Sequence, residues 1–236
     1  MKNKIESYYD DFANAQVTIG INARNLEIQR WTEKFGLKKS DKVLEIGCGI
    51  GTQSELIAKF LTEGNLTSID ISSVSIDIAK DKLKEYSQIE FFVGDIVNMN
   101  FTPPNKFDMI ILPDVIEHIP LESHKKLFEK LRSVLKPSGI ILIHIPNPNY
   151  LQYVHENEPH LLQVLDQPIY TDILCENIYP NDLYIHYLET YSIWVDNCDY
   201  QIIILKPRSS AKSYSVISTK EKSLISKIKN KIKRNL

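Results

Sequence analysis

The sequence predicts a doubly wound α/β fold, in which helices cover both faces of a mainly parallel sheet. Three observations lead to this prediction. Short apolar runs have the length of buried strands, and amphipathic segments separate several of them. The first run turns through three glycines directly into a helical segment. The predicted parallel strands are residues 43–44, 66–69, 89–93, 107–112 and 140–145.

Length and composition fit one large globular domain with small additions. The chain has 236 residues, of which 43% are hydrophobic and 25% charged, as is ordinary for a soluble protein. Its three cysteines are widely spaced, so we expect neither a disulfide framework nor a zinc site. Polar residues follow Met1, and no apolar run approaches the roughly 20 residues that a bilayer requires. We therefore expect a cytoplasmic protein.

Charge is distributed unevenly along the chain. Residues 206–236 contain ten Lys or Arg and one Glu, a net charge of +9. The whole chain carries −2, so residues 1–205 carry −11. An acidic body argues against nucleic acid as the substrate, because phosphate contacts need basic surface.

The stretch that organises the chain is V-L-E-I-G-C-G-I-G-T-Q-S, residues 43–54. Glycines let a ligand lie against the backbone, and the open N–H groups of a helix start add donors. Glu45 stands two residues before the first glycine, where its carboxylate would repel a phosphate. The third glycine also comes one residue earlier than in the dinucleotide fingerprint. The ligand should therefore carry positive charge or donate hydrogen bonds.

These residues resemble the first motif of the class I S-adenosylmethionine-dependent methyltransferases, E-x-G-x-G-x-G. The resemblance extends over roughly residues 40–205 and implies a Rossmann-like mixed sheet of about seven strands. It implies that Glu45, Gly47, Gly49 and Gly51 hold the aminoacid part of the cofactor. The alternative is a tight strand-to-helix turn without a ligand.

Two acids follow the next strands in register. Asp70 ends the second strand, where a carboxylate can accept hydrogen bonds from both ribose hydroxyls, and Ile71 beside it joins the cofactor contacts. The resemblance implies that Asp95 and Ile96, after the third strand, hold the adenine. The alternatives are that Asp70 caps the following helix and that Asp95 only forms a turn.

The fourth strand ends in P-D-V-I-E-H, residues 113–118, which resembles the D-V-x-E-H stretch of small-molecule methyltransferases. We place Pro113 among the cofactor contacts. His118 is the candidate general base because histidine titrates near neutral pH, and Glu117 would do the same or orient the acceptor. Alternatively, the pair only begins the next helix. An N-P-P-Y motif is absent from this position, which counts against flipped bases as substrates.

The N-terminal residues read as helical and contain an aromatic cluster around Tyr8 and Tyr9. The resemblance implies that this segment lies over the cofactor, with Tyr9 facing it, whereas the alternative is that the aromatic side chains pack on the core. We expect two further amphipathic helices, at 73–86 and 122–135. His144, in the fifth strand, is expected to be a core or cleft residue.

The region after the fifth strand has no steady period. We interpret residues 150–188 as an insertion on the substrate side, and we assign no metal to its histidines. A helix is expected at 190–196, a sixth strand at 200–205 and a seventh at 214–217. Residues 223–236 repeat apolar positions every four residues among lysines, which suits an anionic membrane surface. The alternatives are a solvated tail and a helix that docks on the acidic body.

The predicted organisation is a helical cap at 1–40, a methyltransferase domain at 41–218 and a basic amphipathic tail at 219–236. The expected reaction is methyl transfer from S-adenosylmethionine to a small-molecule acceptor. We favour a sugar or glycan precursor, or a lipid-linked or quinone-type molecule that the tail helps to reach at the inner membrane surface. A non-catalytic protein that binds S-adenosylmethionine and a nicotinamide-dependent oxidoreductase are the alternatives.

Overall fold

The computed structural model describes residues 20–208, which form a seven-stranded sheet in the order β3-β2-β1-β4-β5-β7-β6. The first five strands are parallel, and β7 pairs antiparallel with both β5 and β6. The predicted mixed sheet of seven strands is confirmed. The strands are β1 Lys42–Ile46, β2 Asn65–Asp70, β3 Ile89–Val93, β4 Phe107–Pro113, β5 Leu135–Pro146, β6 Leu183–Tyr191 and β7 Tyr200–Pro207.

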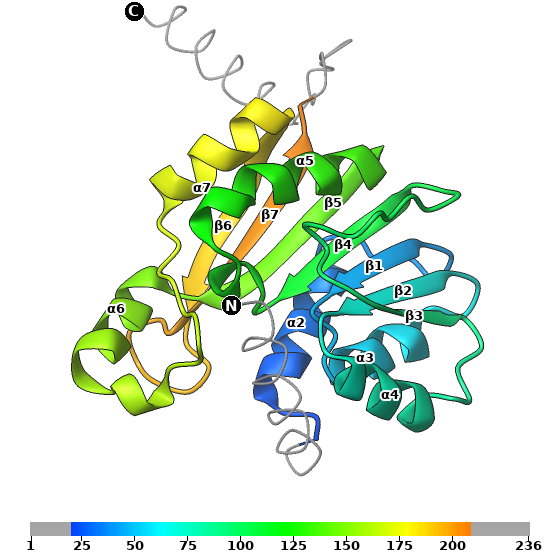
Figure 1. Ribbon diagram of the computed structural model, residues 1–236, viewed down its shortest axis with the longest axis horizontal. Helices are drawn as coiled ribbons and strands as arrows, with labels where there is room; N and C mark the ends of the chain where they lie inside the picture. Colours follow the sequence, from blue (N-terminus) through cyan, green and yellow to red (C-terminus); the bar gives the residue numbers. More distant parts are fainter. Residues whose placement is uncertain (1–19, 209–236) are drawn as a thin grey trace, which may run out of the picture.

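Helices cover both faces of the sheet, and Figure 1 shows α5 and α7 on one side and α2, α3 and α4 on the other. Successive side chains of the central strands point to opposite faces of the sheet. In β4, Ile110 and Leu112 pack with α5 and α7, whereas Met109 and Ile111 pack with α2 and α3. The helices are α2 Ala23–Lys34, α3 Thr52–Phe60, α4 Ser73–Lys82, α5 His124–Val134, α6 Pro148–Asn157 and α7 Thr171–Ile178.

Capping hydrogen bonds mark where helices α2 and α4 begin. Asn22 caps α2 in a reciprocal capping box with Asn25, and the Ser72 hydroxyl accepts the backbone N–H of Ser75 at the start of α4. Helix α4 ends four residues earlier than predicted, with Leu83 as its C-cap. Its buried positions are Ser75, Ile76 and Ala79.

The predicted helix at 190–196 is wrong. Strand β6 runs to Tyr191 and pairs with Tyr200 of β7, so the intervening residues form the loop of an antiparallel hairpin. Buried Asp199 organises this loop, because its carboxylate accepts the backbone N–H groups of Ile193 and Trp194 at 2.7 and 3.0 Å. Because these N–H groups donate to Asp199, they do not form helical hydrogen bonds. The helix that the local sequence predicted is therefore absent here.

The interval predicted as an insertion is more regular than expected. It contains most of α6, a 3-10 turn at Pro159–Leu161, α7, and the first residues of β6. In Figure 1, α6 lies beyond the carboxyl ends of the parallel strands rather than over either face. Strand β6 takes the place predicted for 214–217, which lies outside the described residues, as do Tyr8, Tyr9 and the tail at 219–236. Within 20–208, the structure contains no helix long and apolar enough to cross a membrane.

Candidate active site

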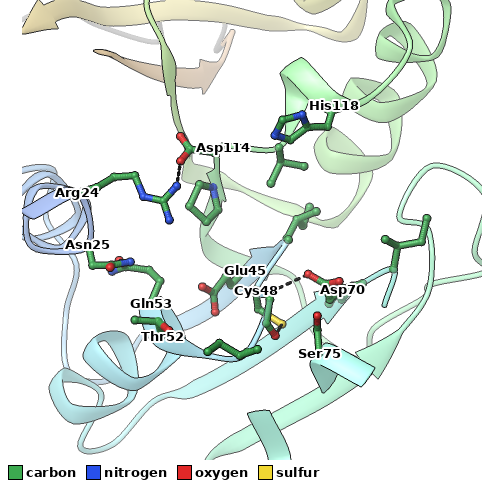
Figure 2. Close-up of a pocket in the computed structure, with 18 of the residues that line it drawn as sticks. Arg24, Asn25, Glu45, Cys48, Thr52, Gln53, Asp70, Ser75, Asp114 and His118 are labelled. Carbon is green, nitrogen blue, oxygen red and sulfur yellow. Dashed lines mark hydrogen bonds and ion pairs between the residues drawn. The ribbon is translucent and has the colours of Figure 1, made fainter. Parts of the chain in front are cut away.

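A cavity of about 390 Å³ opens at the carboxyl ends of β1, β2 and β4. The strand order reverses between β1 and β4, which is where open α/β sheets bind ligands. Figure 2 shows Arg24 and Asp114 on one side of this cavity and Asp70 and Ser75 on another. The predicted contacts that line it are Glu45, Gly47, Gly49, Asp70, Ile71, Asp95, Ile96, Pro113 and His118.

Glu45 is fully buried and only partly satisfied. Its Oε2 accepts hydrogen bonds from the hydroxyls of Ser54 and Ser68, at 2.5 and 3.0 Å. Its Oε1 has no hydrogen-bond partner among the described residues. Burial raises the pKa of this carboxyl to about 7, although both serines act in the opposite direction. A ligand that donates a hydrogen bond or carries positive charge would satisfy the unpaired oxygen.

The three glycines have different roles. Gly47, Gly49 and Gly51 all have positive φ, at 75°, 52° and 79°, a region that favours glycine. A Cβ on Gly47 would lie 2.4 Å from Cγ2 of Val115, so this position has no room for a side chain. A Cβ on Gly51 would lie 2.9 Å from Leu83, and Gly51 does not line the cavity. Gly51 therefore packs close to Leu83 and Ala79, and its predicted contact with the cofactor stays a prediction.

Asp70 fixes the turn that it faces. Its Oδ2 accepts the backbone N–H of Gly49 at 2.7 Å, and its Oδ1 accepts that of Ser72 at 2.9 Å. The N-cap of α4 is Ser72 and not Asp70, so the alternative that Asp70 caps this helix is wrong. The carboxylate lies at the cavity wall with Ile71, in the position predicted for a ribose contact.

Asp95 lines the cavity but also forms a turn. Its two oxygens accept hydrogen bonds from the backbone N–H of Val97 and the side chain of Asn98, at 2.9 and 2.5 Å. Buried Ile96 presents an apolar surface beside it. Both readings of Asp95 therefore have structural support, and an apolar wall next to an acceptor oxygen suits a flat heterocycle with an amino group.

A polar cluster that was not predicted from the sequence lies on the other side of the cavity. Arg24 of α2 forms an ion pair with Asp114, whose other oxygen lies 3.2 Å from Nδ1 of buried His144. The ring of His144 stacks on Tyr200 at 4.7 Å between centroids. Asp114 has φ of 52°, a left-handed value that asparagine and aspartate adopt more readily than most residues. The cluster was not recognisable because its members lie far apart in the sequence.

His118 and Glu117 lie together near a second, smaller cavity. Nδ1 of His118 lies 3.0 Å from a carboxylate oxygen of Asp166 and 2.6 Å from the Leu165 carbonyl oxygen. Burial lowers the pKa of this imidazole, but the nearby acids and the carbonyl outweigh burial and raise it to about 9. Burial also raises the pKa of Glu117. Glu117 lines only the smaller cavity, whereas His118 lines both.

The remaining candidates take part in local contacts. His155 contacts the Asp166 carbonyl oxygen at 2.6 Å, and His160 lies near Glu158. Between residues 20 and 208, no three histidine, cysteine or acidic side chains gather closely enough to hold a metal ion. The three cysteines are free thiols, in agreement with the sequence analysis. His144 is fully buried, as expected of a core residue.

The sheet order and the cavity at its switch point match a known fold. The fold is that of the class I S-adenosylmethionine-dependent methyltransferases. Magnesium protoporphyrin IX methyltransferase from Synechocystis, solved with bound SAH, has a TM-score of 0.69 and 18% identity, covering 88% of this chain and 99% of its own. N-methyltransferase NodS from Bradyrhizobium japonicum has a TM-score of 0.62 and 18% identity, over 79% and 86% of the two chains.

Sequence comparison points to similar proteins. Residues 43–139 match the family described as a methyltransferase domain. Phosphoethanolamine N-methyltransferase from Plasmodium falciparum is 36% identical over 107 residues, which cover 45% of this chain and 40% of that protein. Malonyl-[acyl-carrier protein] O-methyltransferase 2 from Ilyobacter polytropus is 38% identical over 121 residues, covering 49% and 45%. The chain spans less than half the length of these curated relatives.

Proposed function

We propose that this chain transfers a methyl group from S-adenosylmethionine to a small-molecule acceptor. The observation that carries the proposal is the buried, unpaired Oε1 of Glu45 beside a glycine turn that has no room for a side chain. An ammonium group satisfies such an oxygen, whereas a phosphate would be repelled by it. The relatives in the same family are named as methyltransferases of several small or carrier-bound acceptors.

The residues present fit this cofactor along the whole cavity. Glu45 and the backbone at Gly47 and Gly49 would hold its aminoacid end. Asp70 would accept from the ribose, while Asp95 and Ile96 would hold the adenine. When bound, S-adenosylmethionine supplies a methyl group on a positively charged sulfur. The protein then has to orient an acceptor in line with that methyl and exclude water, because positioning supplies much of the rate.

For the acceptor, we favour a sugar or glycan precursor, or a lipid-linked or quinone-type molecule. Support comes from the D-V-I-E-H stretch and from the apolar residues Leu161 and Trp194, which line the two cavities and are more than half exposed. We further propose that the basic tail contacts an anionic membrane surface, although it lies outside the described residues. No nucleic acid partner is proposed, since the body of the chain is acidic.

Two other functions remain as alternatives to be tested. A non-catalytic protein would bind S-adenosylmethionine but would never turn it over, whatever acceptor is supplied. A nicotinamide-dependent oxidoreductase would bind NADH, whose diphosphate Glu45 disfavours. The first alternative differs from the proposed function because no S-adenosylhomocysteine is formed. The second differs because NADH binds.

The first test is a calorimetric titration of the purified chain with S-adenosylmethionine and, separately, with NADH. We expect binding of S-adenosylmethionine alone. Asp70→Ala should weaken it at least tenfold, whereas Asp77→Ala, an exposed change on α4, should not. Formation of S-adenosylhomocysteine with a panel of amines, alcohols and amino sugars then separates catalysis from binding. NADH binding, or no binding of either compound, would overturn the proposal.

A further inference from the structure

We propose that the acceptor binds through an amino group, which Glu117 holds in the smaller cavity. This inference rests on the proposed function and narrows its substrate class. The cavity has a volume of about 180 Å³ and adjoins the larger one. The two share Arg24, Asp114, His118, Gln163 and Tyr200 in their walls. A molecule in the smaller cavity can therefore reach a ligand in the larger one.

The feature that indicates a ligand in this cavity is the carboxyl group of Glu117. Its side chain is 2% exposed, and neither carboxyl oxygen has a hydrogen-bond partner among the described residues. The nearest cation, His118, lies 3.9 Å away through Nε2, beyond hydrogen-bond range. A buried carboxyl with no partner is costly. A bound donor with two or three hydrogens, such as an ammonium group, would satisfy it.

The charges around the cavity favour a cation over a neutral donor. Arg24 is paired with Asp114, and His118 is paired with Asp166. Glu117 is the fifth ionisable group of the wall, and burial raises its pKa. A bound cation would favour its ionised form, and with all five groups ionised their charges sum to −1. A singly charged ammonium group neutralises this net charge of −1. An alcohol leaves the net charge unchanged, and a carboxylate makes it more negative.

Much of the remaining wall is apolar, beside the polar side chains of Gln163, Tyr150 and Tyr200, and can contact a carbon skeleton. Leu151 and Val154 of α6 are buried there, and Pro146, Leu161 and Leu162 complete the surface. Leu161 is more than half exposed, so the skeleton can extend outward past it. An amino sugar and an amine-bearing lipid headgroup both meet this description.

The same placement suits the chemistry of N-methylation. An ammonium nitrogen has no lone pair until it loses a proton, and the Glu117 carboxylate is positioned to take that proton. The freed pair on nitrogen forms the new N–C bond to the methyl group, while the C–S bond breaks and its electron pair stays on sulfur. The charge of the sulfonium is thereby transferred to the methylated amine, so atoms and charges balance without another reactant.

The test uses small probes of matched shape on the full chain saturated with S-adenosylhomocysteine, which prevents turnover. Butylamine, 1-butanol and butyrate are titrated at pH 7.5 and followed by NMR. We expect butylamine to bind at least tenfold more tightly than the other two. Glu117→Gln, which keeps the shape of the side chain, should abolish this preference and leave the affinity for S-adenosylhomocysteine unchanged. Glu122→Gln, an exposed change five residues away, is the matched control and should retain it.

The outcomes separate this inference from the proposed function. Equal or tighter binding of butanol or butyrate, no binding of butylamine, or a preference that survives Glu117→Gln would overturn the inference alone. Failure to bind S-adenosylhomocysteine at all would overturn the proposed function first. With S-adenosylmethionine in place of S-adenosylhomocysteine, methylation of butylamine, measured as the methylated product, with no product from 1-butanol would support both.

Discussion

The Arg24 guanidinium pairs with the Asp114 carboxylate across 90 positions of sequence and joins helix α2 to the end of β4. Nearby Asp114 raises the pKa of the arginine. Burial raises the pKa of the Asp114 carboxyl, but Arg24 and His144 outweigh burial and lower it. Both residues line the two cavities. The pair therefore ties the N-terminal helix to the candidate active site.

Replacement of Arg24 should destabilise the protein measurably. Arg24→Met leaves a buried carboxylate without its partner. The side chains of Arg24 and Asp114 are 31% and 11% exposed, so we expect a loss of about 1–2 kcal/mol, below the value for a fully buried pair. Denaturant unfolding at pH 7 measures it. The lowered pKa of Asp114 means that the loss is full at pH 7 and shrinks as the pH falls below about 4.

Arg30→Met is the matched control for this prediction. Arg30 pairs with Glu27 on the exposed face of the same helix, at 2.5 Å. Its removal should cost less than about 0.5 kcal/mol, as for other surface pairs. Equal losses for the two variants would show that the Arg24 pair has no special role in the fold.

Glu45→Gln should stabilise the ligand-free protein at high pH while it weakens the binding of S-adenosylmethionine. The pKa of Glu45 is raised to about 7, so the folded state holds a proton that the unfolded state loses near pH 4.5. Wild-type stability should therefore fall between pH 4.5 and 7, by at most about 3 kcal/mol. The variant should lack this fall. Unfolding at pH 5 and pH 8, and calorimetry with the cofactor, measure both effects.

Glu55→Gln gives the opposite sign and serves as the control. Hydrogen bonding to Lys59 lowers the pKa of Glu55, so its contribution is present above the unfolded pKa and is lost in acid. A flat stability profile for wild-type protein between pH 5 and 7 would contradict the role assigned to Glu45.

Substitution of two glycines should separate ligand contact from packing. Gly47→Ala and Gly51→Ala each force a left-handed φ on alanine, at a cost of about 1–2 kcal/mol. Only Gly47 lines the cavity, so only Gly47→Ala should also weaken binding of S-adenosylmethionine, by tenfold or more. Thermal unfolding and calorimetry distinguish the two. Gly36→Ala, with φ of 94° and open space around its Cβ, isolates the cost of φ alone.

Asp166→Asn should lower the pKa of His118 from about 9 toward its usual value near 6.5. A raised histidine pKa stabilises the folded state fully below pH 6.5, and this contribution is lost as the pH rises through 9. The variant should therefore be destabilised more at pH 6 than at pH 9.5. NMR titration of the imidazole resonances measures the pKa directly. The resonance of His186, at a distant site beside Lys206, should not move.

Sequence patterns were sufficient wherever neighbours along the chain decide the structure. Local periodicity and spacing predict the five parallel strands, the glycine turn after Glu45 and the acid at Asp70. Each of these features depends on residues that are close together in the sequence. The helix predicted at 190–196 failed for the complementary reason. Its backbone donors bind Asp199, and its flanking residue Tyr191 pairs with Tyr200, contacts that no local pattern encodes.

By itself, the sequence determined the fold class, and it predicted residues that line the larger cavity. Only the tertiary structure placed Arg24 against Asp114, brought Gly51 close to Leu83, and left the Glu117 carboxyl buried without a hydrogen-bond partner. Strands and turns arise from short-range preferences. The partner of a buried charge depends on which distant elements meet it, and this is decided when the sheet and its helices pack together.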